Sequence, residues 1–320
     1  MGKKVVIDDE IIQEINSKIK KSRIRALIIA AVLLIIPIGL WLITRDFMDV
    51  IMVGVMVLIV DGFLIFSLPA YTKAKLLKQK IVPLAVKQAF GSKAIYNARG
   101  GIDSNVLKRM ALFKVYTLSQ EDYISAEFEG VKFICADVDS YQIVKSGDST
   151  RKEYYFQGMV LITDFNKPFN GEVVIKENDY SGGRVGKSLE EFETESIDFN
   201  KSYKGYATNK HLGFYVITPQ LIERLNKIRR LIKGGFCFKF CSDKLYIAIS
   251  GAKNHLEGKN MKKISADVLE QLVKELEPIK TIIGELNLDT SYFRDVDEVI
   301  NEAKTERKKA SRIKEEVTNN

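Results

Sequence analysis

The sequence predicts an N-terminal transmembrane helical hairpin with cytoplasmic helical extensions, followed by an α+β domain with mainly antiparallel strands. Two observations predict the hairpin: residues 26–43 contain no charged side chain, and residues 50–66 form a second apolar run interrupted only by Asp61. A third observation predicts the domain. From about residue 110, apolar and polar residues alternate as in half-buried strands, and amphipathic helical segments separate these runs.

We expect six segments along the chain of 320 residues, which is long enough to bury a sizeable core besides the two spans. They are an amphipathic cytoplasmic helix over residues 1–25, transmembrane helices over 26–44 and 48–69, a basic juxtamembrane helix over 70–95, the α+β domain over 100–285 and a charged tail over 286–320.

Both apolar runs approach the length that a bilayer core requires, about 20 mainly apolar residues. A cleaved signal peptide is one alternative for the first run, because basic residues precede it. The run is longer than an ordinary signal core, no A-x-A site follows it, and the second run begins only a few residues later. A buried hairpin in a soluble protein is the other alternative. We expect two uncleaved spans.

Asp61 does not exclude the second span. On insertion scales an aspartate near the centre of a span costs about 2.5–3.5 kcal/mol, whereas each Leu, Ile, Val or Phe contributes about 0.3–0.6 kcal/mol. Residues 50–66 contain twelve such residues. The apolar contribution therefore outweighs the cost of the carboxyl group.

A packing role is predicted for Asp61. Gly54 and Gly62 mark a small-residue face of the same helix, and at a similar depth on the first span Pro37 leaves the carbonyl of Leu33 without a helical donor. We expect a protonated Asp61 to donate to that region and to join one span to the other or to a second copy. Proton or ion handling, and no particular role, are the alternatives.

Basic residues flank the hairpin on one side only. The segment between the spans carries one arginine against two aspartates. The positive-inside rule therefore places both termini in the cytoplasm, at the cell membrane. The net charge of +8 follows largely from these flanks, which suit anionic lipid headgroups better than nucleic acid, since no nucleic-acid motif accompanies them. The candidate lipid-surface residues are Lys21, Arg23, Arg25, Lys73, Lys75 and Lys78.

The cytoplasmic extensions of the two spans are predicted to pair as a helical stalk. Counted from the membrane, Glu14 of one extension lies level with Lys80 of the other, and Asp9 lies near Lys87. Pro83 is expected to kink the second extension. Two independent interfacial helices are the alternative.

Within the domain, alternation and turn signals predict the individual elements. Thr218 and Pro219 should cap and begin a helix, and Pro278 should bend another over residues 264–284. Strands are expected over 122–144 with a turn at Glu129–Gly130, over 152–165 and 170–177 paired across Asn170–Gly171, over 203–208 and 213–218, and as a hairpin over 235–250.

The loop "SGGRVGKS" at residues 181–188 resembles a phosphate-binding loop but departs from it. Gly186, Lys187 and Ser188 match the motif, whereas Ser181 replaces its first glycine. No strand ends at the loop and no long apolar helix follows it. We interpret it as a flexible surface loop and expect no cofactor.

No catalytic or metal-binding constellation is evident. A G-x-S-x-G motif is absent, and the two histidines, His211 and His255, cannot be assigned to a nucleophile. The three cysteines fit a reducing cytoplasm and do not have the spacing of a zinc site: Cys135, Cys237 and Cys241. The sequence favours a protein that is not an enzyme.

Two segments carry a family resemblance, "FQGMVLITDFNKPFNGEVVI" and "FETESIDFNKSYKGYATNKHLGFYVITPQLIERLNKI". The matching residues are Phe156, Gly158, Asp164, Phe165, Asn166 and Lys167 in the first, and Tyr206, Tyr215, Thr218 and Pro219 in the second. With the preceding hairpin, they resemble an uncharacterised family of bacterial two-span membrane proteins with a domain of unknown function. The resemblance covers residues 20–250 and implies a membrane protein with a cytoplasmic domain, without implying an activity.

We therefore expect an integral membrane protein whose non-catalytic cytoplasmic domain binds a protein partner or anionic lipid headgroups, as a scaffold or regulator. Self-association through the spans is a further expectation, whereas nucleic acid is not expected and no small-molecule substrate can be identified. The alternative is a nucleotide-dependent regulator or enzyme that uses the loop at 181–188.

Overall fold

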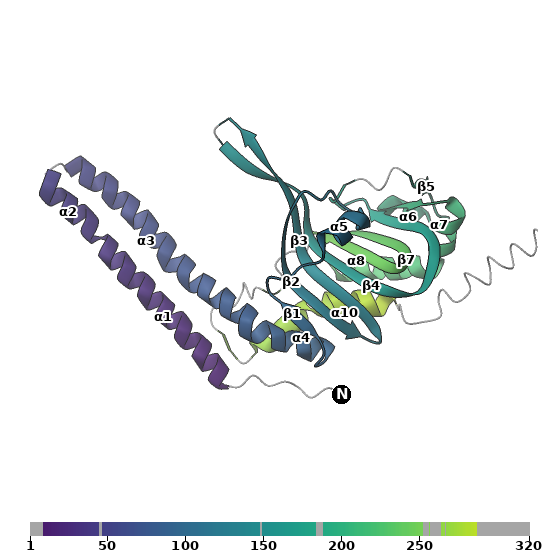
Figure 1. Ribbon diagram of the computed structural model, residues 1–320, viewed down its shortest axis with the longest axis horizontal. Coiled ribbons are helices and arrows are strands. Elements are labelled where there is room, and N and C mark those ends of the chain that lie inside the picture. The colour runs from purple at the N-terminus through teal and green to yellow at the C-terminus, as the bar shows by residue number, and fades with distance from the viewer. Residues whose placement is uncertain are drawn as a thin grey trace, which may run out of the picture. The chain divides into compact units, whose positions relative to one another are not determined.

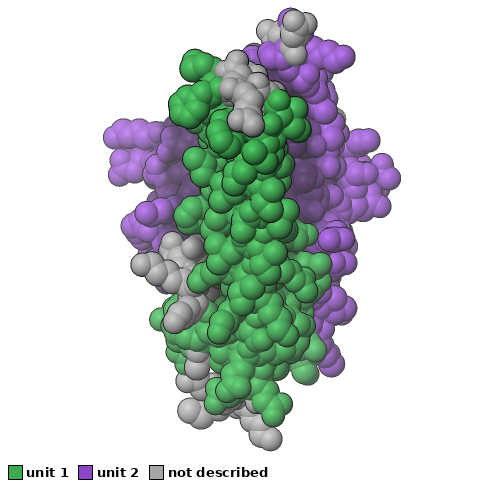
Figure 2. Space-filling view, turned by 90° about the vertical axis from the view of Figure 1, so that its left-hand side faces the viewer, with its two compact units in different colours: residues 1–92, 255–276 green, residues 93–254, 277–320 purple. Residues whose placement is uncertain are grey.

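The computed structural model describes residues 9–44, 47–147, 149–183, 188–251, 256, 264–265 and 267–286. The chain divides into two compact units, which Figure 2 colours separately. Unit 1 comprises residues 1–92 and 255–276, and unit 2 comprises residues 93–254 and 277–320. Two long apolar helices followed by an α+β domain confirm the predicted fold class.

Unit 1 is built on an antiparallel pair of long helices (Figure 1). The first consists of α1 (Asp9–Leu33) and α2 (Ile35–Thr44), and the second is α3 (Phe47–Leu76). By length and composition both could cross a membrane. Only 17% and 11% of their most apolar windows are buried, unlike the core helix of a soluble protein. Large apolar side chains are exposed along both, among them Leu27, Ile28, Trp41, Ile59 and Phe66.

Prolines explain where these helices deviate from regular geometry. Pro37 has no N–H for the carbonyl of Leu33, and the first helix is interrupted at Leu34, whose N–H bonds to Ala30 at 3.1 Å. After α3 comes a π-helical turn, η1 (Leu77–Ile81), and then α4 (Val82–Phe90), with Pro83 in the first turn of α4. The π-helical turn η1 therefore lies directly before Pro83, at the place where the sequence predicts a kink.

The predicted proximity of Glu14 and Lys80 is confirmed, in the segments that adjoin the two apolar helices. Ile15 of α1 and Ile81 of η1 are fully buried, and Lys80 forms an ion pair with Glu14. A later segment joins this unit: α9 (Val268–Glu275) contacts α4, and the Asn16 amide donates to the carbonyl of Ile264 at 2.9 Å. The helix expected over 264–284 thus contributes its first half to unit 1.

Unit 2 is built on one seven-stranded antiparallel sheet. The strand order is β1-β2-β3-β4-β6-β5, and β7 pairs with β4. The strands are β1 (Ile95–Asn97), β2 (Thr117–Phe128), β3 (Val131–Ser146), β4 (Ser149–Glu177), β5 (Glu190–Phe192), β6 (Tyr203–Ala207) and β7 (Gly235–Ser250).

The turn predicted at Glu129–Gly130 is confirmed, because it joins β2 to β3 with both residues at positive φ. Two other predicted hairpins are wrong. The chain does not reverse at Asn170–Gly171, since β4 continues to Glu177, and β7 runs unreversed along β4 from Cys237 to Ser250. The residues that favour a turn form irregularities within long strands instead. In β4 the pairing register shifts between Asp164 and Glu172, and in β7 Ser242 has a positive φ.

Gly158 permits the close approach of β4 to β7. A Cβ at this position would lie 1.9 Å from the carbonyl oxygen of Ile249. Its place in the family motif therefore has a packing explanation.

Among the described residues of unit 2, five segments are helical: α5 (Ser104–Met110), α6 (Ile197–Ser202), α7 (Lys210–Val216), α8 (Pro219–Leu231) and α10 (Glu277–Leu286). The prediction for α8 is confirmed, because the Thr218 hydroxyl caps it by accepting from the N–H of Leu221 at 3.2 Å. The strand predicted over 213–218 is wrong, since most of it lies in α7. The Asn209 side chain caps that helix by accepting from the N–H of Leu212 at 2.9 Å.

The two faces of the sheet carry different helices. Leu107 and Met110 of α5 pack in a buried cluster with Ala136 and Ile162. On the opposite face, the ammonium of Lys280 in α10 lies 6.0 Å from the centre of the Phe128 ring. There α10 contacts α8 through an ion pair of 2.7 Å between Glu285 and Lys227. Because α5 is short, it covers only part of its face.

Candidate functional site

A cleft of about 500 Å³ lies on the face of the sheet that carries α5. Its floor is one row of residues that are direct neighbours across five strands. Figure 1 labels these strands β1, β2, β3, β4 and β7. In order they are Ile95, Ser125, Ile134, Ile162 and Tyr246. Ile162 is buried, Ile134 and Tyr246 are half-buried, and Ile95 is 60% exposed. The floor is therefore a mainly apolar strip.

A second row of charged residues borders this strip. Glu127 of β2 faces Lys132 of β3, and Asp164 of β4 faces Lys244 of β7. Lys244 forms an ion pair with Asp164, and this hydrogen bond raises the pKa of the lysine. These acids offset two of the four basic side chains that line the cleft.

The other border is formed by α5 and the residues before β1. The Asp103 carboxylate caps α5 by accepting from the N–H of Asn105 at 2.6 Å. Val106 and Arg109 of this helix line the cleft, and Lys93 lies at the β1 end. Within the described part of the chain, neither Arg109 nor Lys93 forms an ion pair. With four basic and two acidic side chains, the lining has a formal net charge of +2.

The lining of the cleft suits the binding of a small ligand. Among the residues that the structure describes, no three His, Cys, Asp or Glu side chains are grouped as metal ligands. The volume falls within the range of ligand pockets, about 300–1,000 Å³. An apolar floor with basic borders matches an amphipathic anion. Sequence reasoning missed this site because its floor consists of residues far apart in the chain.

Asp61 lies where the hairpin helices meet. It is 5% exposed, and neither carboxyl oxygen has a hydrogen-bond partner among the described residues. The predicted hydrogen bond to the backbone near Leu33 is therefore not formed. Pro37 is also buried, whereas Gly54 and Gly62 are half-buried and have space for a Cβ, with no neighbouring atom within 4 Å.

Basic residues lie near the end of the stalk that adjoins the apolar segments of α1 and α3. Thr72 donates to the carbonyl of Leu68 at 2.8 Å, so Ser22 is the donor in its hydrogen bond of 2.9 Å to Thr72. This contact places Ser22 of α1 opposite Thr72 of α3. The basic residues on either side of it form what we call the basic belt: Lys21, Arg23 and Arg25 from α1, Lys73 and Lys75 from α3, and Lys78 from η1.

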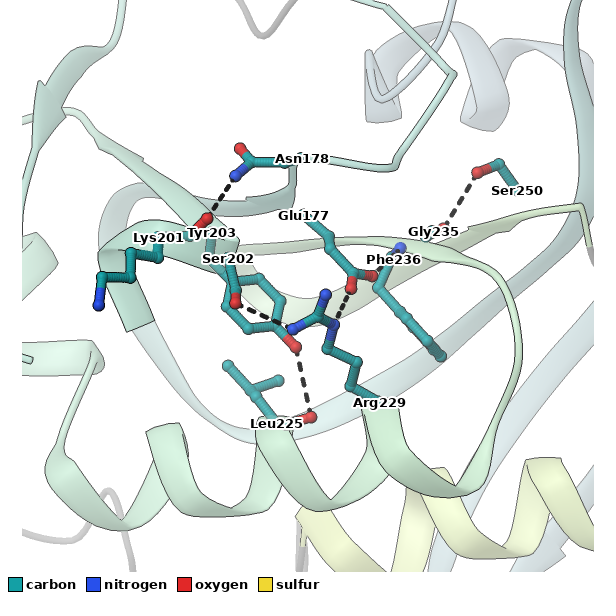
Figure 3. Close-up of polar contacts among 10 residues, drawn as sticks. All are labelled: Glu177, Asn178, Lys201, Ser202, Tyr203, Leu225, Arg229, Gly235, Phe236 and Ser250. Atoms are coloured by element: carbon teal, nitrogen blue, oxygen red, sulfur yellow. Dashed lines mark hydrogen bonds and ion pairs between the residues drawn. The ribbon is translucent and has the colours of Figure 1, made fainter. Parts of the chain in front are cut away.

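An ion pair that the sequence did not predict joins β4 to α8 in unit 2 (Figure 3). Glu177, at the end of β4, has a side chain only 2% exposed and pairs with Arg229 of α8. Its second oxygen accepts from the N–H of Phe236 at 3.0 Å, and Arg229 donates to the Ser202 hydroxyl at 2.9 Å. Since both partners are satisfied within the protein, this cluster is structural.

The remaining candidates from the sequence are not assembled into a site. Residues 184–187 of the glycine-rich loop lie outside the described residues, as does His255, and His211 is exposed on α7. Burial raises the pKa of the Cys237 thiol to about 12, so it is not a nucleophile at neutral pH. Phe156 of the family motif stacks on Phe113 at 4.2 Å in the core.

Part of the chain is similar to a known protein family. No curated protein matches the sequence significantly. The crystal structure of the mycobacterial trehalose monomycolate transport factor A, TtfA, is similar over 63% of this chain and 95% of that chain, with 11% identity. Its TM-score of 0.37 is too low to say anything about function. Residues 154–288, from β4 to just beyond α10, match a family model described as a protein of unknown function, DUF3137.

The family match supports the predicted domain of unknown function. A bacterial two-span family remains a prediction. The chain thus contains a region similar to DUF3137 after two helices that are compatible with a membrane.

Proposed function

We propose that this protein is an integral membrane protein of the cell membrane, with both termini in the cytoplasm, that binds anionic lipid headgroups through the basic belt. It acts as a scaffold or regulator, and its α+β domain is a non-catalytic binding module. The observation that carries the proposal is the Ser22–Thr72 contact. It supports an arrangement in which the basic residues of α1 and α3 lie at a similar distance from the apolar segments.

The position of the belt matches a membrane surface. It adjoins the apolar segments of α1 and α3, whose side chains are exposed along the spans. Lysines and arginines near an anionic surface each contribute about 1 kcal/mol of attraction. The positive-inside rule favours the cytoplasmic side for such a cluster. Of the two partners expected from the sequence, the belt favours lipid headgroups over a protein.

Lipid dependence of stability tests the headgroup proposal. In nanodiscs, replacing phosphatidylcholine by phosphatidylglycerol should raise the melting temperature of the wild type. The triple variant Lys21→Gln, Arg23→Gln, Lys75→Gln should lose most of this increase, about 3 kcal/mol of preference for the anionic lipid. A matched control neutralises exposed residues of unit 2: Lys108→Gln, Lys145→Gln, Arg151→Gln. Equal responses of the two triple variants would overturn the proposal.

Labelling with a membrane-impermeant maleimide tests the orientation. Phe47→Cys lies at the start of α3, between the spans, and should react in intact cells. Ser149→Cys, at the start of β4, should react only after permeabilisation. The opposite pattern would contradict cytoplasmic termini.

A further inference from the structure

We propose that the cleft in unit 2 binds a single-chain amphiphile with an anionic head, a long-chain fatty carboxylate. This site is separate from the basic belt, and the inference does not depend on the function proposed above. Its basis is the combination of a mainly apolar floor, a surplus of positive charge and a volume of about 500 Å³.

The length of the floor is compatible with an acyl chain. Five strands contribute one residue each, so the row from Ile95 to Tyr246 spans four interstrand spacings. At about 4.8 Å per spacing this amounts to roughly 19 Å. An extended chain advances about 1.2 Å per bond, since three bonds of a residue span about 3.5 Å, so the row accommodates about 16 bonds. A chain of about 12 to 16 carbons fits this row.

The head group is assigned to the end at Tyr246. Arg109 and Tyr246 both line the cleft, so a guanidinium and a phenol are available to a head group there. Arg109 forms no ion pair among the described residues, and α5 holds it on the border of the cleft. A carboxylate at this end can accept two hydrogen bonds from the guanidinium and one from the phenol.

The rest of the chain then lies over apolar side chains. From the Tyr246 end it would pass Ile162 and Ile134, cross Ser125 and end at Ile95, whose exposed side chain it would cover. Contact with these residues removes apolar surface from water on both sides, which drives binding without further polar groups. Lys244 is already paired with Asp164, so it contributes little to the choice of ligand.

An acidic peptide is the competing occupant. The β1 strand pairs only with β2 within the described sheet, so an extended peptide could add to its other edge. The row of floor residues favours an acyl chain over a peptide. Its apolar residues follow one another across the strands, whereas an added peptide strand would lie alongside β1, at one end of the cleft.

Photocrosslinking locates the ligand on the full-length protein in nanodiscs. The probe is a palmitate analogue with a diazirine in its chain, and labelled peptides are identified by mass spectrometry. We expect labels in the peptides that contain Ile95, Ile134 and Tyr246, and competition by myristate. Myristyl alcohol, which lacks the charge, should compete about tenfold less well, as expected for the loss of one charge-assisted interaction.

Two variants separate the head-group and chain contacts. Arg109→Gln should weaken labelling of the cleft about tenfold, whereas Arg151→Gln, an exposed arginine on β4 away from the cleft, should not change it. Ile95→Glu adds a carboxylate to the floor at an exposed position and should also abolish labelling. Thermal unfolding of each variant shows that it is folded.

Three outcomes would overturn the inference. Labels confined to residues 26–66 would mean that the probe only partitions into the lipid. Equal labelling of the cleft in Arg109→Gln and Arg151→Gln would remove the head-group site. Competition by an acidic peptide in the absence of competition by myristate would identify the cleft as a peptide site.

Discussion

The ammonium of Lys80 donates a hydrogen bond to the carboxylate of Glu14, 66 residues earlier in the chain. The same carboxylate accepts from Lys18, one helical turn along α1, at 2.6 Å. Because these residues belong to antiparallel helices, the contact defines the register of the stalk, with Ile15 and Ile81 buried beside it. The sequence predicts this pair from the distances of its members to the two spans.

Reversal of one charge in the stalk should be corrected by reversal of the charges that it meets. Lys80→Glu places two carboxylates together and should lower the melting temperature of the protein in nanodiscs. The triple variant Glu14→Lys, Lys18→Glu, Lys80→Glu restores opposite charges at both contacts of residue 14 and should recover most of the loss. Failure of the two further substitutions to recover any stability would show that the pair contributes nothing to the stalk.

The contribution of Glu14 should depend on acid pH. Hydrogen bonds from Lys18 and Lys80 lower the pKa of this carboxyl group to about 2. Since the pKa is depressed in the folded protein, the stabilisation is complete above the unfolded value of about 4.3 and is lost as the pH falls towards 2. Wild type and Glu14→Gln should therefore differ in stability at pH 6 and converge near pH 2. A constant difference over this range would contradict the assignment.

Replacing Asp61 should stabilise the hairpin. Both carboxyl oxygens are buried without a hydrogen-bond partner among the described residues, so Asp61→Leu removes an uncompensated polar group. We expect a gain of about 1–3 kcal/mol in thermal or denaturant unfolding of the protein in detergent. A loss of stability, or of a dimer in the same detergent, would mean that Asp61 has a partner in a second copy or another membrane protein.

Alanine variants of Gly54 and Gly62 test whether the small-residue face of α3 packs against another helix. A Cβ at either position meets no atom within 4 Å, so the alanine variants should retain or slightly increase stability, by up to about 1 kcal/mol each from helix propensity. The measurement is the same unfolding experiment, with oligomeric state determined by light scattering. Loss of an oligomer in either variant would show that the face packs against a second copy.

Loss of Arg229 should destabilise unit 2 by leaving the Glu177 charge buried. Arg229→Met keeps the length of the side chain but removes the ion pair and the hydrogen bond to Ser202. Because Arg229 itself is 40% exposed, we expect about 2–3 kcal/mol, below the full cost of breaking a buried pair. Arg230→Met changes the exposed neighbour and should stay within about 0.5 kcal/mol. Equal effects of the two variants would show that the pair is not important.

Local patterns predicted much of the fold and little of the candidate cleft. The cap at Thr218, the turn at Glu129–Gly130 and the apolar helices follow from neighbouring residues, and the structure contains them. The segment 213–218 was predicted as a strand because its pattern alternates, but the cap at Asn209 begins a helix there. In β4, the turn signal at Asn170–Gly171 is overridden, because both edges of the strand are paired around it.

The sequence by itself determined the two apolar helices, the basic residues that flank them and the alternation of the α+β domain, because hydropathy, charge and period are properties of neighbouring residues. The tertiary structure decided three other features. It aligned five strands so that Ile95 and Tyr246 end one row, placed Glu177 beside Arg229, and left Asp61 without a partner among the described residues. The physical reason is that strand register and helix packing join residues far apart in the chain, whose pairing depends on the whole core and leaves no local pattern in the sequence.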